Sequence, residues 1–253
     1  METTAIPTQL GFAHFIAQAD GLAHFLLVVL LAMSVITWYL IVSKSLANWR
    51  MKKHARAFLA RFWDAPDLAA VTDYLQNHGV SDPFSHLTHH GLKAAEQYRN
   101  RTGQRMIESG SEDEFLTRAL RRAIDQGTAP LEYGHTMLAS IASSAPFIGL
   151  FGTVWGIYHA LVNIGMSGSG SLDQVAGPVG EALIMTALGL AVAIPAVLAY
   201  NFFNRSKHRM VAEVEGFAHD LFAFMQTGVR HGLHDRSVRE TPRVSPLPTA
   251  GRA

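Results

Sequence analysis

Two long apolar stretches decide the fold of this chain: MLASIASSAPFIGLFGTVWGIYHALVNIG at residues 137–165 and VGEALIMTALGLAVAIPAVLAYNFF at residues 179–203. Each is longer than the roughly 20 residues with which an apolar helix crosses the hydrocarbon core of a bilayer. Between Glu132 and Arg205 the sequence holds two acids, Asp173 in the polar link and Glu181 in the second stretch, and no Lys or Arg. The stretches are therefore predicted to form a hairpin of two transmembrane helices with a single carboxylate inside it.

A third uncharged segment precedes the hairpin and ends in Trp38, Tyr39 and a cationic run that begins at Lys44. Hydrophobic residues make up 49% of the 253 residues and charged residues 16%, and the apolar residues are gathered in blocks. This pattern is typical of a helical membrane protein. We therefore expect an all-α membrane protein whose three transmembrane helices occupy residues 22–43, 135–164 and 178–203.

The positive charges predict how the chain crosses the membrane. All 21 Lys and Arg residues lie at 44–122 or 205–252. Lys and Arg beside spanning helices are retained on the cytoplasmic side. We expect the N-terminal segment 1–21, predicted to be interfacial and retained, and the loop 165–177 to face outward.

The remaining segments are predicted to be cytoplasmic. Residues 44–134 show helical periodicity, and Ser111-Glu112-Asp113-Glu114 matches a capping box, so a small helical domain is expected there. The second and third membrane helices are expected to be long and to extend into the cytoplasm, the third through residues 204–234. The tail at 235–253 is rich in Pro and predicted to be disordered. A helical seam beyond the third span is predicted to meet partner helices, and it consists of Met210, Val214, Phe217, Leu221 and Phe224.

Glu181 has two interpretations. A carboxylate within a span is costly in lipid, so it usually faces a protein interior or a watery path and takes part in proton transfer there. Alternatively, Glu181 follows Pro178 by three residues and lies in the first helical turn at headgroup level, where the helix dipole favours an anion. The sequence leaves both interpretations open.

Two threonines are predicted to lie at the same depth. If the hairpin turns near Ser169 and Gly170, residues whose numbers sum to about 339 are level, because both helices rise by the same amount per residue. Thr153 is then level with Thr186. Either each hydroxyl bonds the carbonyl one turn back, which is the structural interpretation, or the two line a pore.

Small residues and prolines surround the threonines. Small side chains at steps of three and four let helices approach closely, and they are expected to form packing surfaces here. Prolines within spans produce kinks and free carbonyl groups. The small residues are Gly149, Gly152, Gly156 and Gly189, and the prolines, predicted to be nearly level with each other, are Pro146 and Pro195.

The sequence indicates no enzyme and no cofactor. We find no phosphate-binding glycine loop, nucleophile elbow or paired-carboxylate motif. His86 with His89 or His90 has metal-compatible spacing, but no Cys or carboxylate completes a site, so no metal is expected. His159 is interpreted as an interfacial residue, and the cationic run at 44–61 as a topology anchor rather than a nucleic-acid site.

The run SAPFIGLFGTVWGI at 144–157, followed by GEALIMTALGL at 180–190 and AIPA at 193–196, resembles the ExbB/TolQ/MotA family, and most closely its ExbB and TolQ branch. The resemblance covers the second and third spans. One departure is Pro178, which is displaced by one position from the family pattern and affects where the third span starts.

The resemblance implies a proton-channel subunit of the bacterial inner membrane, with the N-terminus in the periplasm and the C-terminus in the cytoplasm. It implies a homopentamer around an ExbD-like single-span partner, which powers a TonB-like protein for outer-membrane uptake of siderophores, haem or vitamin B12. Glu181, Thr153 and Thr186 match the family positions that line the pore.

Three alternatives remain. Within the family, a TolQ-like motor of the Tol-Pal system has the same motifs. Outside it, a non-conducting membrane scaffold would use the small-residue faces for assembly alone. A channel formed by this chain alone is disfavoured, because one glutamate near a helix end provides no relay through the inner half of the bilayer.

Overall fold

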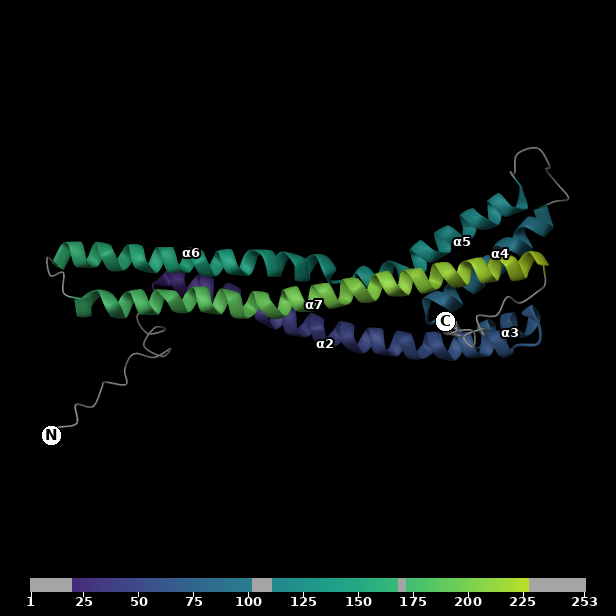
Figure 1. Ribbon diagram of the computed structural model, residues 1–253, viewed down its shortest axis with the longest axis horizontal. Coiled ribbons are helices and arrows are strands. Elements are labelled where there is room, and N and C mark those ends of the chain that lie inside the picture. Colours follow the sequence, from purple (N-terminus) through teal and green to yellow (C-terminus); the bar gives the residue numbers. More distant parts are fainter. Residues whose placement is uncertain (1–19, 102–110, 168–171, 228–253) are drawn as a thin grey trace, which may run out of the picture. The chain divides into compact units, whose positions relative to one another are not determined.

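The computed structural model describes residues 20–101, 111–167 and 172–227, with the backbone alone for Glu181 and for several residues at helix ends. Every element in these ranges is helical, which confirms the predicted fold class. The elements shown in Figure 1 are α2 (Gly21–Asp64), α3 (Leu68–His78), α4 (Pro83–Arg101), α5 (Glu112–Thr128), the 3-10 helix η1 (Ala129–Glu132), α6 (His135–Ser167) and α7 (Leu172–Thr227).

Three of the described helices are long and apolar enough to cross a membrane. They are α2, residues His135–Met166 of α6 and residues Ala182–Gln226 of α7. Large apolar side chains on the hairpin point outward, among them Phe147, Leu198 and Phe202, each more than 60% exposed. An apolar surface of this kind needs lipid or another protein to cover it. The three predicted spans are therefore confirmed as candidates.

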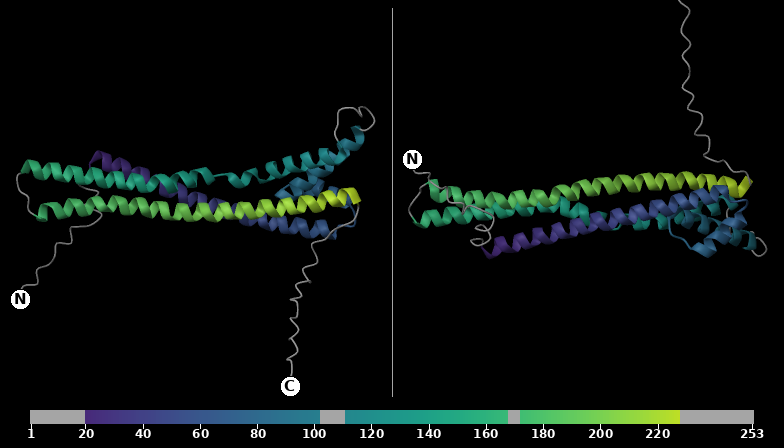
Figure 2. Two further views of the ribbon diagram at one scale, coloured as in Figure 1. Left: turned by 45° about the horizontal axis from the view of Figure 1, so that its top comes forward. Right: turned by 90° about the horizontal axis from the view of Figure 1, so that it is seen from below.

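The chain divides into two compact units. The first, here called the hairpin unit, contains residues up to Lys53 together with Thr128–Val211. In it, α6 and the first half of α7 run antiparallel and side by side, as both views of Figure 2 show. Its core joins these two helices to α2 through buried apolar side chains, which include Leu30, Leu40, Leu138, Ile141, Met185, Ala196 and Phe203.

The second unit contains His54–Gly127 and the chain from Ala212 onward, and it is here called the cytoplasmic unit only after the location that the sequence predicts for it. Its core is aromatic: the ring of Phe217 lies 5.0 Å from that of Phe62 and 5.5 Å from that of Phe84, centroid to centroid, in edge-on geometry. The seam residues Val214 and Leu221 are completely buried. In this unit the seam thus packs against helices of its own chain, rather than being left for partner helices.

Local signals fix the helix ends of the cytoplasmic unit. The Asp67 carboxylate accepts a hydrogen bond from the Ala70 amide at the start of α3, and Gly79 ends that helix with a φ of 72°. Such a positive φ favours glycine. The Ser111 hydroxyl accepts from the Glu114 amide at 3.4 Å, which is one half of the predicted capping box.

Helix α7 starts earlier than expected. It begins at Leu172, whereas the sequence interpretation placed a loop through residue 177. The helix-breaking Gly and Ser residues end at Ser171, and residues 172–176 have ordinary helix propensity, so the break is short. The predictions for segment 1–19 and for the tail from residue 228 lie outside the described residues.

Candidate functional site

The two hairpin helices approach each other backbone to backbone at Gly149. A β-carbon placed on Gly149 would lie 2.7 Å from the carbonyl oxygen of Met185 and 3.0 Å from the Cα atom of Gly189. Real side chains do not reach such distances from backbone atoms, so only glycine fits there. The predicted packing role of Gly149 and Gly189 is thus visible as a close helix contact.

The same contact continues toward the outer end of the hairpin. A β-carbon on Gly152 would lie 2.9 Å from the Met185 side chain, and one on Gly156 would lie 3.0 Å from the β-carbon of Ala182. The Met185 side chain is flexible and can shift, whereas the β-carbon of Ala182 moves only with its backbone. The helices are therefore tightest at Gly149 and less constrained at Gly152.

Thr153 lies inside this contact and meets Thr186. The Thr153 side chain is buried, and its hydroxyl is hydrogen-bonded to that of Thr186. The Thr153 hydroxyl also lies 3.1 Å from the Gly149 carbonyl oxygen, one turn back, and 3.3 Å from the Ala182 carbonyl oxygen across the contact. The structure thus confirms the predicted level of the two threonines and, for Thr153, the predicted bond to the preceding turn.

The chemistry of these groups limits the directions that the hydrogen bonds can take. A hydroxyl has one proton to donate, and a carbonyl oxygen can only accept. If the Thr153 proton goes to the Gly149 or Ala182 carbonyl oxygen, Thr186 must donate to Thr153. The Thr186 oxygen then retains acceptor capacity. Two coupled hydroxyls thus occupy the buried face of the hairpin.

Glu181 belongs to the same hairpin, but its side chain lies outside the described part of the structure. Its backbone is in α7, five residues before Thr186. At about 1.5 Å per residue this places it about 7.5 Å from Thr186 along the helix axis, toward the outer end. Because α7 begins at Leu172, nine residues earlier, Glu181 does not lie in the first helical turn, and the second interpretation is wrong on that point. The role of Glu181 in proton transfer remains a prediction.

The outer end of the hairpin unit has a polar contact of its own. The His159 ring nitrogen Nε2 lies 3.6 Å from the Asp20 carboxylate, just before α2, and the His159 ring lies 4.5 Å from that of Trp155. An imidazole between an aromatic ring and an acid suits the interfacial position predicted for it. Asp20 was not singled out from the sequence, because a contact between residues so far apart has no local pattern.

The prolines lie within the helices, and neither breaks its helix. Pro146 is inside α6, and Pro195 is inside α7. Each lacks the backbone N–H of an ordinary helix residue, and the kinks predicted at these positions remain predictions. Their neighbours Ala145 and Ala196 are completely buried in the hairpin core.

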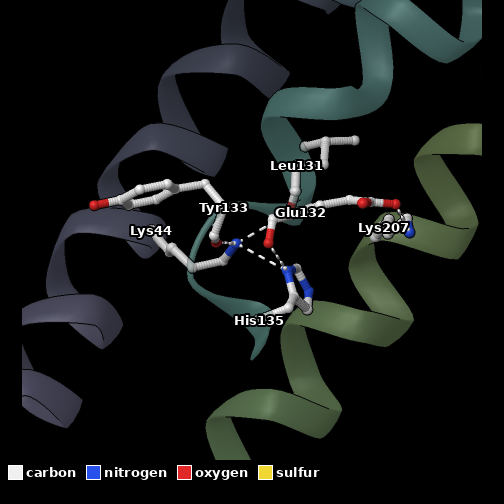
Figure 3. A network of polar contacts seen from close by, with 6 residues as sticks. All are labelled: Lys44, Leu131, Glu132, Tyr133, His135 and Lys207. Atoms are coloured by element: carbon white, nitrogen blue, oxygen red, sulfur yellow. Dashed lines mark hydrogen bonds and ion pairs between the residues drawn. The ribbon is translucent and has the colours of Figure 1, made fainter. Parts of the chain in front are cut away.

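At the other end of the hairpin unit, Lys44 joins α2 to the start of α6 (Figure 3). This side chain is only 6% exposed. Its ammonium donates to the carbonyl oxygens of Leu131, at 3.0 Å, and Tyr133, and lies 3.2 Å from Nδ1 of His135. The two carbonyl oxygens accept two of the three ammonium protons, and no carboxylate is among these partners. Nδ1 of His135 also lies 3.1 Å from the Glu132 carbonyl oxygen, so it accepts the third proton only in the tautomer that leaves Nδ1 unprotonated. The sequence interpretation treated Lys44 only as a topology anchor.

Beside it, Glu132 of η1 forms an ion pair with Lys207 of α7 (Figure 3). The hydrogen bond and charge of Lys207 hold the pKa of the Glu132 carboxyl below its ordinary value of 4.5. Together, Lys44 and Lys207 tie η1 to α2 and to α7. These contacts lie directly before the start of α6 at His135.

The histidines of α4 do not gather metal ligands. The rings of His86 and His90 lie 4.3 Å apart, and His89 and His90 lie 5.5 Å apart. Among the described residues there is no group of three or more His, Asp or Glu side chains that could hold a metal ion. Helix α4 therefore presents imidazoles at close range without completing a metal site in this part of the chain.

These features define a class of protein: a multi-pass helical membrane protein whose glycine-lined hairpin contains a hydrogen-bonded pair of threonine hydroxyls. Comparison with known proteins gives the family. The profile of the MotA/TolQ/ExbB proton channel family matches residues 83–216, more than half of the chain. The chain belongs to this family, as the sequence motifs predicted.

The relatives separate the branches of the family. Biopolymer transport protein ExbB of Xanthomonas campestris pv. campestris strain B100 is 43% identical over 235 residues, which cover 90% of this chain and 93% of that protein. ExbB of Neisseria meningitidis serogroup A is 43% identical over 194 residues, covering 77% and 87%. The Tol-Pal system protein TolQ of Pseudomonas aeruginosa is 33% identical over 217 residues, covering 85% and 92%. These identities favour the ExbB branch over the TolQ branch.

Proposed function

We propose that this chain is an ExbB-type proton-channel subunit of the bacterial inner membrane, which works with an ExbD-like single-span partner. Together they would convert the proton motive force into work on a TonB-like protein, for outer-membrane uptake of siderophores, haem or vitamin B12. The observation that carries the proposal is the Thr153–Thr186 hydroxyl pair, which lies on the buried face of the hairpin within the segments that bear the family motif.

In this proposal, Glu181, Thr153 and Thr186 bound the proton path, and the group that changes protonation during each cycle is on the partner. The two hydroxyls can exchange hydrogen bonds with each other and with the Gly149 or Ala182 carbonyl. Hydroxyls in series offer a proton both a donor and an acceptor at each step.

We further propose that the chain acts as a homopentamer, with its N-terminus in the periplasm and its C-terminus in the cytoplasm. Exposed apolar side chains on the hairpin unit support assembly, because they require lipid or neighbouring subunits as cover. The restriction of all 21 Lys and Arg residues to 44–122 and 205–252 supports the orientation.

The test is complementation. The chain and its ExbD-like partner are expressed in a bacterium that lacks the energisers of both the TonB and the Tol-Pal systems. Siderophore-dependent growth and resistance to detergent are then scored separately. We expect siderophore-dependent growth to return without full detergent resistance. Restoration of detergent resistance alone would move the chain to the TolQ function, despite the lower identity to TolQ.

The residues are tested in the same strain. Glu181→Gln and the double variant Thr153→Ala/Thr186→Ala should abolish uptake while the complex still assembles. Glu215→Gln is the matched control, because Glu215 is an exposed glutamate on the same helix α7. Normal uptake with Glu181→Gln would overturn the proposed role of the carboxylate and favour a scaffold that conducts no protons.

A further inference from the structure

A groove in the cytoplasmic unit has no role in the proposed proton path. It runs between α4 and α5 and has a volume of about 590 Å³. We call it the α4–α5 groove. Ala94, Ala119 and Ala123 line part of the groove, and their small side chains leave room between the two helices. A space of this size is within the range of sites for small molecules, about 300–1,000 Å³.

Helical periodicity places cations along both sides of the groove. Arg118 and Arg122 are four residues apart on α5, and His90 and Lys93 are three residues apart on α4. Residues at these spacings share one face of a helix. All four side chains line the groove. Two arginines of α5 and one lysine of α4 therefore face the same space from opposite helices, with the titratable His90 beside them.

The groove contains no negative charge to balance them. Its ten lining residues include three permanent cations and no Asp or Glu. Glu114 pairs with Arg118 at 3.2 Å, but it lies outside the lining and both side chains are more than half exposed. An exposed pair of this kind contributes little, so Arg118 can exchange that partner for another anion at small cost.

The lowered pKa of His90 is consistent with the positive charge around the groove. Burial lowers the pKa of its imidazole, and the neighbouring charges of His86, His89 and Lys93 lower it further. Each of these neighbours disfavours a second positive charge. A bound anion would raise the pKa of His90, because it favours the protonated imidazole.

The donors are suited to a phosphate group. Arginine presents a planar fork of N–H groups that binds phosphate oxygens in pairs, and lysine adds a compact charge. The amides of Gln97 and Gln126 add neutral donors at the edges of the groove, and Phe115 adds an apolar wall. We propose that the α4–α5 groove binds a phosphorylated ligand, held by Lys93, Arg118 and Arg122. Such a group is carried either by a soluble phosphorylated compound or by the headgroup of an anionic lipid.

Binding should strengthen as the pH falls. The groups around His90 are His86, His89 and Lys93 on α4, and Arg118 and Arg122 across the groove. A phosphate between them favours the protonated imidazole, and by linkage a protonated imidazole favours the phosphate. The affinity for an anion of constant charge should therefore rise as the pH falls toward and below 6.5, the ordinary pKa of His90.

The experiment uses the full chain purified with its ExbD-like partner. The soluble probe is cyclic trimetaphosphate, whose charge is constant between pH 6 and pH 8, and its binding is measured by titration calorimetry. The lipid probe is phosphatidylglycerol, measured by mass spectrometry as the amount retained after washing with phosphatidylcholine micelles. Binding of trimetaphosphate indicates a soluble ligand, and selective retention of phosphatidylglycerol indicates a lipid headgroup.

Three variants make the result specific. Arg118→Gln/Arg122→Gln should weaken whichever probe binds by about tenfold or more, because two charge-assisted contacts are lost. Arg121→Gln is the control, since Arg121 is an exposed arginine of α5 that does not line the groove, and it should change binding less than twofold. His90→Gln should retain binding and lose its pH dependence. Absence of binding by both probes, or equal binding by the wild type and the double variant, would overturn the proposal.

Discussion

Gly189 packs directly against the backbone of Ala145: a β-carbon on Gly189 would lie 2.7 Å from the Ala145 carbonyl oxygen. This is the counterpart of the contact between Gly149 and the Met185 carbonyl oxygen. The two glycines thus face each other, and each leaves room for the opposite helix. The threonine pair forms next to this contact because the helix axes are close there.

Replacing Gly189 with Ala should therefore loosen the hairpin. The added methyl group meets backbone atoms, which cannot rotate away, so we expect a loss of about 1–3 kcal/mol in the free energy of unfolding. This loss is measured by unfolding the purified protein in denaturing detergent. Gly216→Ala is the control on the same helix, because a β-carbon there meets no atom within 4 Å. Equal stabilities of the two variants would contradict the close contact.

The hydroxyl pair predicts coupled effects. Thr153→Val removes the hydrogen-bond partner of Thr186 and leaves the Thr186 hydroxyl poorly paired. This should lower the free energy of unfolding by about 1 kcal/mol. In a double-mutant cycle, Thr153→Val and Thr186→Val should show a coupling energy of at least about 0.5 kcal/mol.

Two controls belong to that measurement. Thr153→Ser keeps the hydroxyl and should restore most of the stability and of the proton flux. Thr136→Val lies on the exposed face of the same helix α6 and should show no coupling with Thr186→Val. Additive effects of the two core substitutions would mean that the hydroxyls do not interact.

The level of Thr153 and Thr186 could be predicted from one sequence, because the two arms of a short-linked hairpin rise equally from a common turn. The start of α7 at Leu172 could not be predicted, because Gly177 and Pro178 indicated that the loop continues to residue 177. Pro178 is accommodated within the helix, and the link is therefore shorter. The prediction that Thr153 and Thr186 are level is not affected by the wrong loop length, because it depends only on the midpoint of the link between the two helices.

The environment of Lys44 could not be predicted either. Its acceptors, the carbonyl oxygens of Leu131 and Tyr133, are 87 and 89 residues away along the chain. Backbone carbonyls occur at every position, so no residue type marks them in the sequence. A lysine after an apolar segment predicts a membrane-flanking charge, but its burial depends on tertiary packing alone.

Lys44 should consequently be hard to replace. Lys44→Met keeps much of the apolar stem but leaves the Leu131 carbonyl oxygen buried without its donor, at about 1–3 kcal/mol. We expect lower resistance to denaturing detergent and faster proteolysis at residues 129–134. Lys52→Met, at an exposed position of the same helix α2, should have little effect. A fully stable Lys44→Met protein would show that the three contacts contribute nothing.

The ion pair between Glu132 and Lys207 gives a prediction about pH. Because the pKa of Glu132 is lowered in the folded state, its contribution to stability is present above its ordinary value of 4.5 and is lost as the pH falls through the lowered value. Lys207→Met should return the pKa of Glu132 toward 4.5, as observed by carbon NMR of the labelled carboxyl. Arg209→Met removes an exposed cation two residues along α7 and should leave that pKa unchanged. An equal shift in both variants would mean that the Glu132 carboxyl responds to the general positive charge of this helix end rather than to its contact with Lys207.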